Sequence, residues 1–224
     1  MSRPFLVFDM DGVLVDVTES YRETISRTVE HFTGAPVPRA IIQDYKNRGG
    51  WNDDWRLSHE LISSREVTVQ FQDVVDYFQG IFHGSGADGL ILRERWIARE
   101  GFLERLAERF QLAVFTGRLC WEAELTLKRF APHLTFSPVV GMDSVKELKP
   151  HPEGLLQILT AAAGEKAWYV GDTVDDARCA KAAATPFIGI ADPANPRYAE
   201  LARALHDAGA VAVLDNINGL EGVL

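Results

Sequence analysis

The chain has 224 residues, of which 46% are hydrophobic and 25% charged, as is usual for a globular protein with a sizeable core. Its net charge of -9 argues against general nucleic-acid binding, which needs a basic surface. Two cysteines are too few for a disulfide framework, and no signal peptide or membrane-length apolar run is found. We therefore expect a cytoplasmic monomer or weak homodimer without membrane or nucleic-acid partners.

Short apolar runs recur along the chain, and each has the length of a strand without polar alternation. This pattern is typical of strands buried on both faces of a parallel sheet. The runs are Phe5–Phe8, Leu112–Phe115, Trp168–Val170, Phe187–Ile190 and Val211–Leu214.

Helical stripes separate these runs from about Gly101 to the end. The first is Phe102, Leu103, Leu106 and Phe110, the second runs from Leu155 to Ala162, and the third contains Tyr198, Leu201, Ala202 and Leu205. Pro152 suits the first turn of the second helix. Alternation of strands and helices predicts an α/β protein with a Rossmann-like, doubly wound parallel sheet.

The stretch from about Val17 to Arg93 interrupts this alternation and contains no convincing strand. Its apolar spacing predicts a helix from Tyr21 to Phe32 that ends near Gly34, and a longer helix from Val67 to Phe82. We therefore expect two domains: a core of residues 1–16 and 94–224, and an inserted all-helical cap of residues 17–93.

Polar residues follow several of the predicted strands. Asp9 and Asp11 follow the first, Thr116 the second and Asp172 the third, while Lys149 lies on a loop that leads into a helix. The carboxyl ends of the strands are where open α/β sheets build their ligand sites. We therefore expect these side chains to meet at one edge of the sheet.

These residue types suit phosphoryl transfer. The moving group needs a nucleophile, a cation for its oxygens, a hard metal ion and a proton donor for the leaving oxygen. An aspartate can attack through an aspartyl-phosphate, and Mg²⁺ prefers the oxygens that Asp9 and Asp172 offer. Thr116 adds a hydroxyl, Gly117 lets backbone N–H groups approach, and Lys149 is a compact positive charge.

Four segments in order, FDMDGVLVD, FTGR, KPHPEGL and VGDTVDD, resemble the four motifs of the haloacid dehalogenase (HAD) superfamily. The likeness covers essentially the whole chain. The position of the helical insert is similar to that of the phosphoglycolate phosphatase and β-phosphoglucomutase subfamily. The resemblance implies a Mg²⁺-dependent phosphatase that hydrolyses a small phosphorylated metabolite through an aspartyl-phosphate intermediate.

The resemblance also implies roles for the acids. Asp9 attacks phosphorus, and Asp11 protonates the leaving oxygen and later activates water. Asp9, the backbone carbonyl of Asp11 and Asp172 bind Mg²⁺. The family spacing of the fourth motif selects Asp176, near the metal or its waters, and leaves out Asp175.

The same resemblance assigns the phosphoryl group to Thr116, Gly117 and Lys149. Arg118, which follows directly, is expected to face solvent. Lysines and short acid-rich helix starts are common on surfaces, and the order of the motifs is what favours the functional interpretation.

Two other functions stay open. A phosphomutase of the β-phosphoglucomutase type is one, but those enzymes carry a histidine twelve residues after the nucleophile, where this chain has Tyr21. A non-catalytic phosphometabolite-binding module is the other, and the intact motif set argues against it. Dehalogenases lack the second acid, so Asp11 favours phosphate chemistry.

The segment YKNRGGWNDDWRLSHEL (Tyr45–Leu61) is expected to be a loop that joins two cap helices and faces the active site. Arg48 could pair with a substrate anion and Trp51 could cover an apolar face. With Tyr21, these are the candidate specificity residues. Surface ion pairing of Arg48 and core packing of Trp51 remain equally open.

Overall fold

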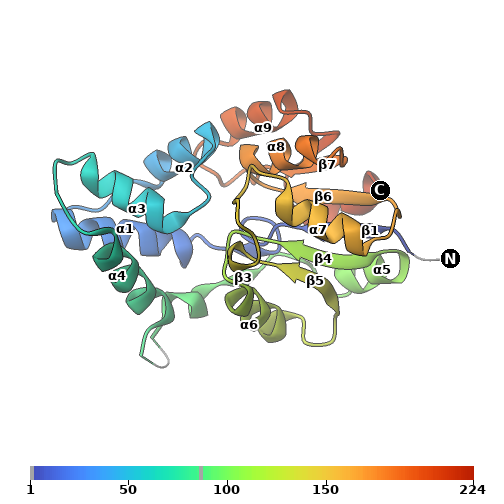
Figure 1. The fold of residues 1–224 in the computed structure, drawn as a ribbon, viewed down its shortest axis with the longest axis horizontal. Coiled ribbons are helices and arrows are strands. Elements are labelled where there is room, and N and C mark those ends of the chain that lie inside the picture. Colours follow the sequence, from blue (N-terminus) through green and yellow to red (C-terminus); the bar gives the residue numbers. More distant parts are fainter. Residues whose placement is uncertain (1–2, 86–87) are drawn as a thin grey trace. The chain divides into compact units, whose positions relative to one another are not determined.

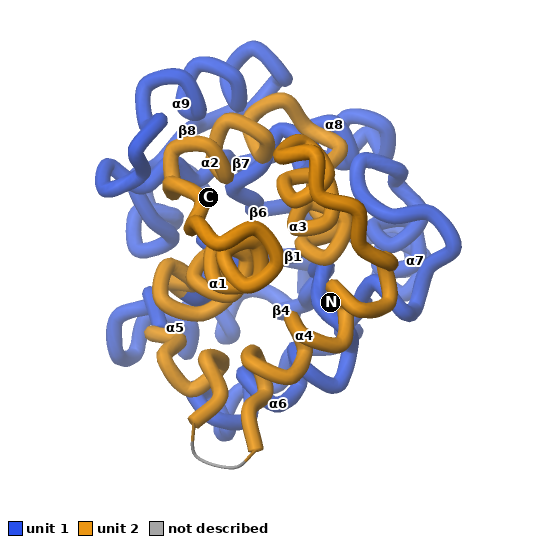
Figure 2. The backbone as a smooth tube through the Cα atoms, turned by 90° about the vertical axis from the view of Figure 1, so that its left-hand side faces the viewer, with its two compact units in different colours: residues 1–15, 96–224 blue, residues 16–95 orange. Residues whose placement is uncertain are grey.

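The computed structural model describes residues 3–85 and 88–224 of the chain. The chain divides into two compact units, which are coloured separately in Figure 2. The first comprises the chain up to Val15 together with Trp96–Leu224, and the second comprises Asp16–Arg95. The sequence had suggested boundaries after residues 16 and 93.

The first unit contains a six-stranded parallel sheet (Figure 1). The strand order is β5-β4-β1-β6-β7-β8, so the first strand lies inside the sheet. The strands are β1 (Phe5–Phe8), β4 (Gln111–Phe115), β5 (Phe136–Val140), β6 (Ala167–Gly171), β7 (Phe187–Ile190) and β8 (Ala212–Leu214). The predicted Rossmann-like α/β class is confirmed.

Both faces of the central strands of this sheet are buried. On one face, Val7, Phe115 and Tyr169 belong to a cluster with residues of three helices. The alternate residues Phe8 and Val114 point to the opposite face and are also inaccessible to solvent. This double burial explains why the strands are continuous apolar runs.

Helices connect the strands, and three of the five described here, at 102–109, 153–161 and 198–207, follow the predicted stripes. They are α5 (Phe102–Arg109), α6 (Cys120–Phe130), α7 (Glu153–Ala161), α8 (Val174–Ala182) and α9 (Tyr198–Asp207). Short 3₁₀ turns span Met142–Ser144 and Ile217–Gly222. Pro152 is the N-cap of α7 and not its first helical residue.

Strand β5 was not predicted, and the reason is its composition. Its sequence FSPVV contains Pro138, which cannot donate a ladder hydrogen bond. Proline is tolerated on edge strands, and β5 is an edge that pairs only with β4, with an irregular register around this position.

The second unit is built from helices α1 (Tyr21–Thr33), α2 (Arg39–Arg48), α3 (Asp54–Ser63) and α4 (Phe71–His83), followed by a 3₁₀ turn at Leu90–Arg93. Helix α1 packs against α3 and α4. It ends at Gly34, which has a positive φ of 78° that favours glycine. The short strands β2 (Val15–Asp16) and β3 (Arg95–Trp96) pair where the chain passes between the units.

Two expectations about this unit were wrong. Helix α4 begins at Phe71 and not at Val67, because the preceding Val-Thr-Val run is β-branched and disfavours a helix. The expected loop Tyr45–Leu61 is also much shorter. Helix α2 continues to Arg48 and α3 starts at Asp54, whose N-cap Asp53 accepts hydrogen bonds from the backbone of Trp55 and Arg56.

Among the described residues, no helix has both the length and the hydropathy needed to cross a bilayer. Cys120 and Cys179 are both free thiols.

Candidate active site

Three neighbouring strands bring the predicted site residues together. Because β4, β1 and β6 are adjacent, their carboxyl ends place Thr116, Asp9 and Asp172 at one edge of the sheet. Backbone hydrogen bonds continue one residue past the strands: the N–H of Asp9 donates to Val170 O (2.8 Å) and that of Thr116 to Val140 O (3.0 Å). The first residue after each of these two strands is therefore held by the sheet.

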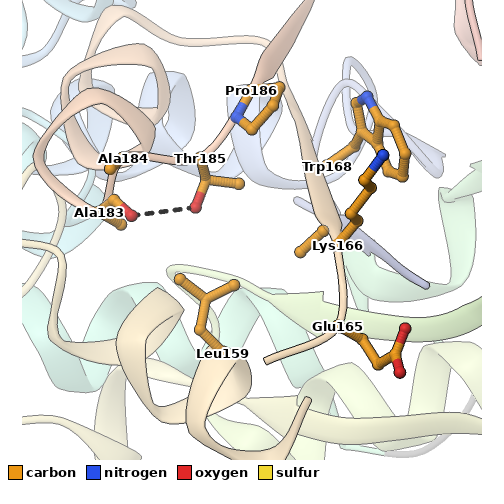
Figure 3. Close-up of a pocket in the computed structure, with 9 residues that line it drawn as sticks. Leu159, Glu165, Lys166, Trp168, Ala183, Ala184, Thr185 and Pro186 are labelled. Carbon is orange, nitrogen blue, oxygen red and sulfur yellow. Dashed lines mark hydrogen bonds between the residues drawn. The ribbon is translucent and has the colours of Figure 1, made fainter. Parts of the chain in front are cut away.

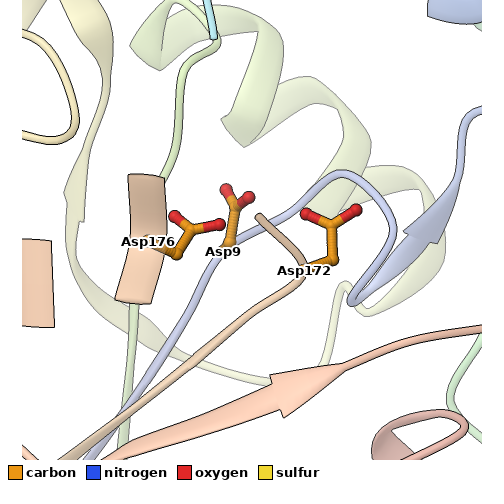
Figure 4. Close-up of side chains that lie close together, drawn as sticks. All are labelled: Asp9, Asp172 and Asp176. Carbon is orange, nitrogen blue, oxygen red and sulfur yellow. The ribbon is translucent and has the colours of Figure 1, made fainter. Parts of the chain in front are cut away.

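Asp9, Asp172 and Asp176 form an acidic cluster. One carboxylate oxygen of each lies within 4.8 Å of the others. Figure 4 shows Asp9 between the other two side chains. Asp9 and Asp176 are buried, and Asp172 is half-buried. Hard carboxylate oxygens gathered in this way are the ligands that Mg²⁺ prefers.

Lys149 lies against this cluster. Its Nζ is 3.0 Å from Asp9 Oδ1 and 2.7 Å from Asp176 Oδ1, and the residue is only 6% exposed. Nζ also lies 4.9 Å from the ring centre of Phe115 and 5.6 Å from that of Tyr169. Burial disfavours its charge, but Asp176 and Asp9 outweigh burial and raise the pKa of Lys149 above its usual value.

Asp176 is surrounded by hydrogen-bond donors. Its Oδ1 accepts from Lys149 and from the hydroxyl of Tyr169 (2.6 Å), and its Oδ2 accepts from the N–H (3.0 Å) and hydroxyl (2.6 Å) of Thr173. Burial alone would raise the pKa of Asp176, but Lys149 and these donors lower it below its usual value. Asp176 is therefore an ionised anchor for Lys149. Asp175 instead pairs with Arg178 of the same helix (3.4 Å).

Asp9 has the opposite tendency. Burial raises its pKa to about 7; Lys149 opposes this rise, while Asp176 and Asp11 add to it. The cluster holds three carboxylates beside one lysine, which contacts Asp9 and Asp176, so acids outnumber cations among these four side chains and leave an excess of negative charge. A divalent cation fits this excess because it stabilises the ionised form of Asp9.

Asp11 is held by a residue that the sequence had assigned to solvent. Arg118 Nε and Nη2 lie 2.7 and 2.5 Å from Asp11 Oδ1, and the Arg118 side chain is 1% exposed. The expectation that Arg118 faces solvent was therefore wrong. A surface position was the default for an arginine after a turn, whereas the acidic surroundings draw this one inward.

Gly12 allows the first loop to approach Asp172. Its φ is +75°, and a Cβ placed there would lie 2.1 Å from Asp172 Oδ2. The N–H of Gly12 donates to Val15 O (2.8 Å), which closes the turn after Asp11. Only glycine combines this backbone conformation with this close contact.

Thr116 and Gly117 start the loop after β4. Thr116 is buried, and its hydroxyl accepts a hydrogen bond from the N–H of Arg118 (3.2 Å). Gly117 is half-buried in the following bend. The structure thus brings Asp9, Asp11, Thr116, Gly117, Lys149, Asp172 and Asp176 into the same unit, and their catalytic roles remain predictions.

The candidate specificity residues belong to the second unit. Tyr21 is buried, with its ring 4.1 Å from that of Phe82 and 6.2 Å from that of Phe78. The guanidinium of Arg48 lies over the ring of Tyr45 (5.1 Å), and Trp51 meets the same ring edge-on (5.1 Å). These contacts all lie within the second unit, and a contact with substrate stays a prediction.

A hollow of about 480 Å³ lies at the other edge of the sheet (Figure 3). Its lining includes Leu159, Trp168 and Pro186, near the amino ends of β6 and β7. The acidic cluster follows the carboxyl ends of the strands. The hollow is therefore separate from the acids.

Sequence reasoning missed three residues of the site: Tyr169, Thr173 and Arg118. Thr173 could have been found, because Thr173 and Asp176 have the spacing of a capping box, and both of its hydrogen bonds are present. Tyr169 was assigned to the apolar core, and only its hydroxyl reaches Asp176. No local pattern identifies Arg118, because its partner Asp11 is 107 residues away.

Known proteins are similar to this chain over most of its length. The model of the haloacid dehalogenase-like hydrolase family matches residues 6–190. A phosphoglycolate phosphatase from Mesorhizobium japonicum is 26% identical over 85% of this chain and 83% of its own length. An imidazoleglycerol-phosphate dehydratase from Phytophthora nicotianae is 30% identical over 93% of this chain, which spans about half (49%) of that relative.

Solved structures agree with the fold. Phosphatase Tt82 from Thermococcus thioreducens superposes with a TM-score of 0.65 at 27% identity, over 90% of this chain and 99% of that protein. The family match includes all four motif segments, from β1 to β7. The chain belongs to the haloacid dehalogenase-like hydrolases.

Proposed function

We propose that the protein is a Mg²⁺-dependent phosphatase that hydrolyses a small phosphorylated metabolite through an aspartyl-phosphate on Asp9. The observation that carries this proposal is the buried cluster in which Lys149 contacts Asp9 and Asp176 beside Asp172. The phosphatase names of two relatives support the same class of reaction.

The residues present fit a magnesium ion. The donors are carboxylates, their charge exceeds that of Lys149, and Gly12 makes room for Asp172. Asp9, Asp172 and the backbone carbonyl of Asp11 would hold the ion. When bound, Mg²⁺ neutralises charge on the phosphoryl oxygens. Asp176 takes part mainly by anchoring Lys149, since its own oxygens already accept four hydrogen bonds.

The chain's own residues carry out two steps. In the first, a carboxylate oxygen of Asp9 attacks phosphorus, the bond to the leaving oxygen breaks, and Asp11 gives that oxygen a proton. In the second, Asp11 takes a proton from water as the water oxygen attacks phosphorus. The bond between Asp9 and phosphorus then breaks, and inorganic phosphate leaves.

Lys149 and Thr116 hold the phosphoryl group during both steps. Lys149 keeps its charge because Asp9 and Asp176 raise its pKa, and so it can stabilise the added negative charge of the transition state. The buried position of Lys149 strengthens this interaction, since water screens it little.

The test is phosphate release from a panel of phosphomonoesters that includes 2-phosphoglycolate, with Mg²⁺ or with a chelator. Wild-type protein should release phosphate only with Mg²⁺, and Asp9→Asn should lower kcat by at least about 10³-fold, because it removes the nucleophile. Activity that survives in Asp9→Asn would overturn the nucleophile assignment. Conversion of glucose 1-phosphate to glucose 6-phosphate with little free phosphate would instead favour the mutase.

A further inference from the structure

We propose that Arg118 is the positioning residue for Asp11: its buried guanidinium fixes the carboxyl group that exchanges protons with the leaving oxygen and with water. This inference rests on the proposed phosphatase function. The inference goes beyond that function because it assigns a role to Arg118, a side chain for which the four motifs imply no role.

The guanidinium is bound at both ends. Nε and Nη2 reach Asp11 Oδ1, while Nη1 donates to the hydroxyl of Thr126 on α6 (3.0 Å). Thr126 is itself 1% exposed. Because a guanidinium is planar, two fixed ends determine its orientation, and the orientation of Asp11 follows.

The backbone of Arg118 is fixed as well. Its N–H donates to the hydroxyl of Thr116 (3.2 Å), and its carbonyl accepts from the N–H of Met142 (2.8 Å). Arg118 therefore links the proposed acid to the loop that carries the proposed phosphate ligand. A shift of Arg118 would move Asp11 relative to the phosphoryl group.

Asp11 itself has less support from its surroundings. Its side chain is 24% exposed, against 1% for that of Arg118. The turn after Asp11 is closed by backbone hydrogen bonds, which position the chain and not the carboxyl group. Without the guanidinium, the carboxyl group could rotate, and misplacement of a general acid costs rate more than binding.

Two esters separate the roles of Asp11. An alkyl phosphate needs a proton on its leaving oxygen in the first step, whereas 4-nitrophenolate leaves without one. Both esters need Asp11 as the base in the second step. A misplaced Asp11 therefore slows both steps with the alkyl ester but only the second step with 4-nitrophenyl phosphate.

The experiment compares wild type, Arg118→Met, Arg118→Lys and Asp11→Asn on 4-nitrophenyl phosphate and on the alkyl ester of the panel that wild type hydrolyses fastest. We expect Arg118→Met to lower kcat on the alkyl ester by about 10²-fold with KM changed less than about threefold. On 4-nitrophenyl phosphate it should release one nitrophenolate per enzyme in a burst, with phosphate trapped on Asp9 by acid quench. Arg118→Lys, which keeps the charge but loses the fork, should recover part of the rate.

A double-mutant cycle isolates the pair. If Arg118 acts through Asp11, Asp11→Asn combined with Arg118→Met should be no slower than Asp11→Asn alone. Additive losses in this cycle would overturn the inference. An Arg118→Met variant would also overturn it if its KM were raised or if its kinetics were those of wild type. The same holds if it lost the same rate on both esters and showed no burst.

The control is Arg105→Met. Arg105 also pairs with a carboxylate, donating from Nε and Nη2 to the two oxygens of Glu221 (3.1 and 3.2 Å), but it is half exposed, and its loss should leave both esters unaffected. If Arg118→Met does not fold by circular dichroism, Thr126→Val and Arg118→Lys replace it, and equal losses on both esters without a burst on 4-nitrophenyl phosphate overturn the inference. A wild type without phosphate release would refute the proposed function itself, whereas an active wild type with a normal Arg118→Met refutes only this inference.

Discussion

Two buried lysines, one in each unit, are paired with aspartates in different proportions. Lys46 of α2 is 6% exposed and pairs with Asp54 (2.5 Å), which also has Arg22 nearby (3.9 Å). Lys149 is equally buried but contacts two carboxylates of a cluster of three. Around Lys46, the cationic side chains equal or outnumber the single carboxylate of Asp54. Around Lys149, the carboxylates outnumber the lysine.

This difference separates a structural ion pair from a site. A buried balanced pair needs nothing further, although it adds little net stability over an apolar replacement. In the acidic cluster, burial first and the neighbouring carboxylates of Asp176 and Asp11 second keep the pKa of Asp9 raised. Because the two lysines are equally buried, the number of carboxylates around each lysine distinguishes the candidate site of the first unit from the ion pair of the second.

The largest expected effect comes from Lys149→Met. It leaves Asp9 and Asp176 buried without their counter-charge, and the loss of one partner of a buried pair costs about 3 to 5 kcal/mol. Phosphate release should also be lost, because the phosphoryl group loses its cation. Urea unfolding and the phosphate assay measure the two effects. Unchanged stability would mean that the three carboxylates do not depend on Lys149.

A pH titration of stability without metal should show the raised pKa of Asp9 directly. The pKa of Asp9 is about 7 when folded and near 3.8 when unfolded, so the folded state holds the proton more tightly between these values. Stability should therefore fall as pH rises from about 4 to 7, by about 3 to 4 kcal/mol, since one pKa unit corresponds to about 1.4 kcal/mol. The lowered pKa of Asp176 acts only below this window.

Urea unfolding in the presence of a chelator, at several pH values, measures this slope. Asp9→Asn should flatten it, because asparagine does not titrate. Added Mg²⁺ should restore stability most strongly near pH 7, where Asp9 is ionised. An equal slope in wild type and Asp9→Asn would place the titrating group elsewhere.

Lys46→Met tests the balanced pair. We expect a loss of about 2 kcal/mol in unfolding free energy, less than for Lys149 because Arg22 remains beside Asp54. At temperatures where the variant is folded, kcat should stay within about threefold of wild type. A loss of kcat beyond tenfold would show that this pair also serves the reaction, and would remove the contrast between the two lysines.

The smallest loss of stability is expected when Asp53 is replaced, an aspartate whose hydrogen bonds go to backbone N–H groups and not to a lysine. Asp53 caps α3 by accepting from the N–H groups of Trp55 (3.0 Å) and Arg56 (3.1 Å). Asp53→Ala should cost about 1 kcal/mol, and Asp53→Ser, which can still cap, less than half of that. Urea midpoints of the two variants give the comparison, and equal losses would argue that capping is not what Asp53 contributes.

The sequence predicts the parts that depend on local pattern. Buried parallel strands are apolar throughout, which identifies β1, β4, β6 and β7, and the polar residues that follow β1, β4 and β6 identify the edge where the site lies. Edge strand β5 is not predicted, because its proline interrupts the continuous apolar run that identifies the other strands. The pairing of Arg118 with Asp11 also escapes, since it depends on which strands become neighbours and not on any spacing along the chain.

The position of β1 inside the sheet also matters for how the protein folds. This strand is the first of the six to be synthesised, but its two neighbours are β4 and β6, which begin at Gln111 and Ala167. It can form no native ladder until more than a hundred further residues have left the ribosome, and such long-range pairing is slow. The segment that precedes Asp9 is therefore apolar and unpaired during synthesis for longer than any other strand of the sheet. We expect molecular chaperones to bind this segment first.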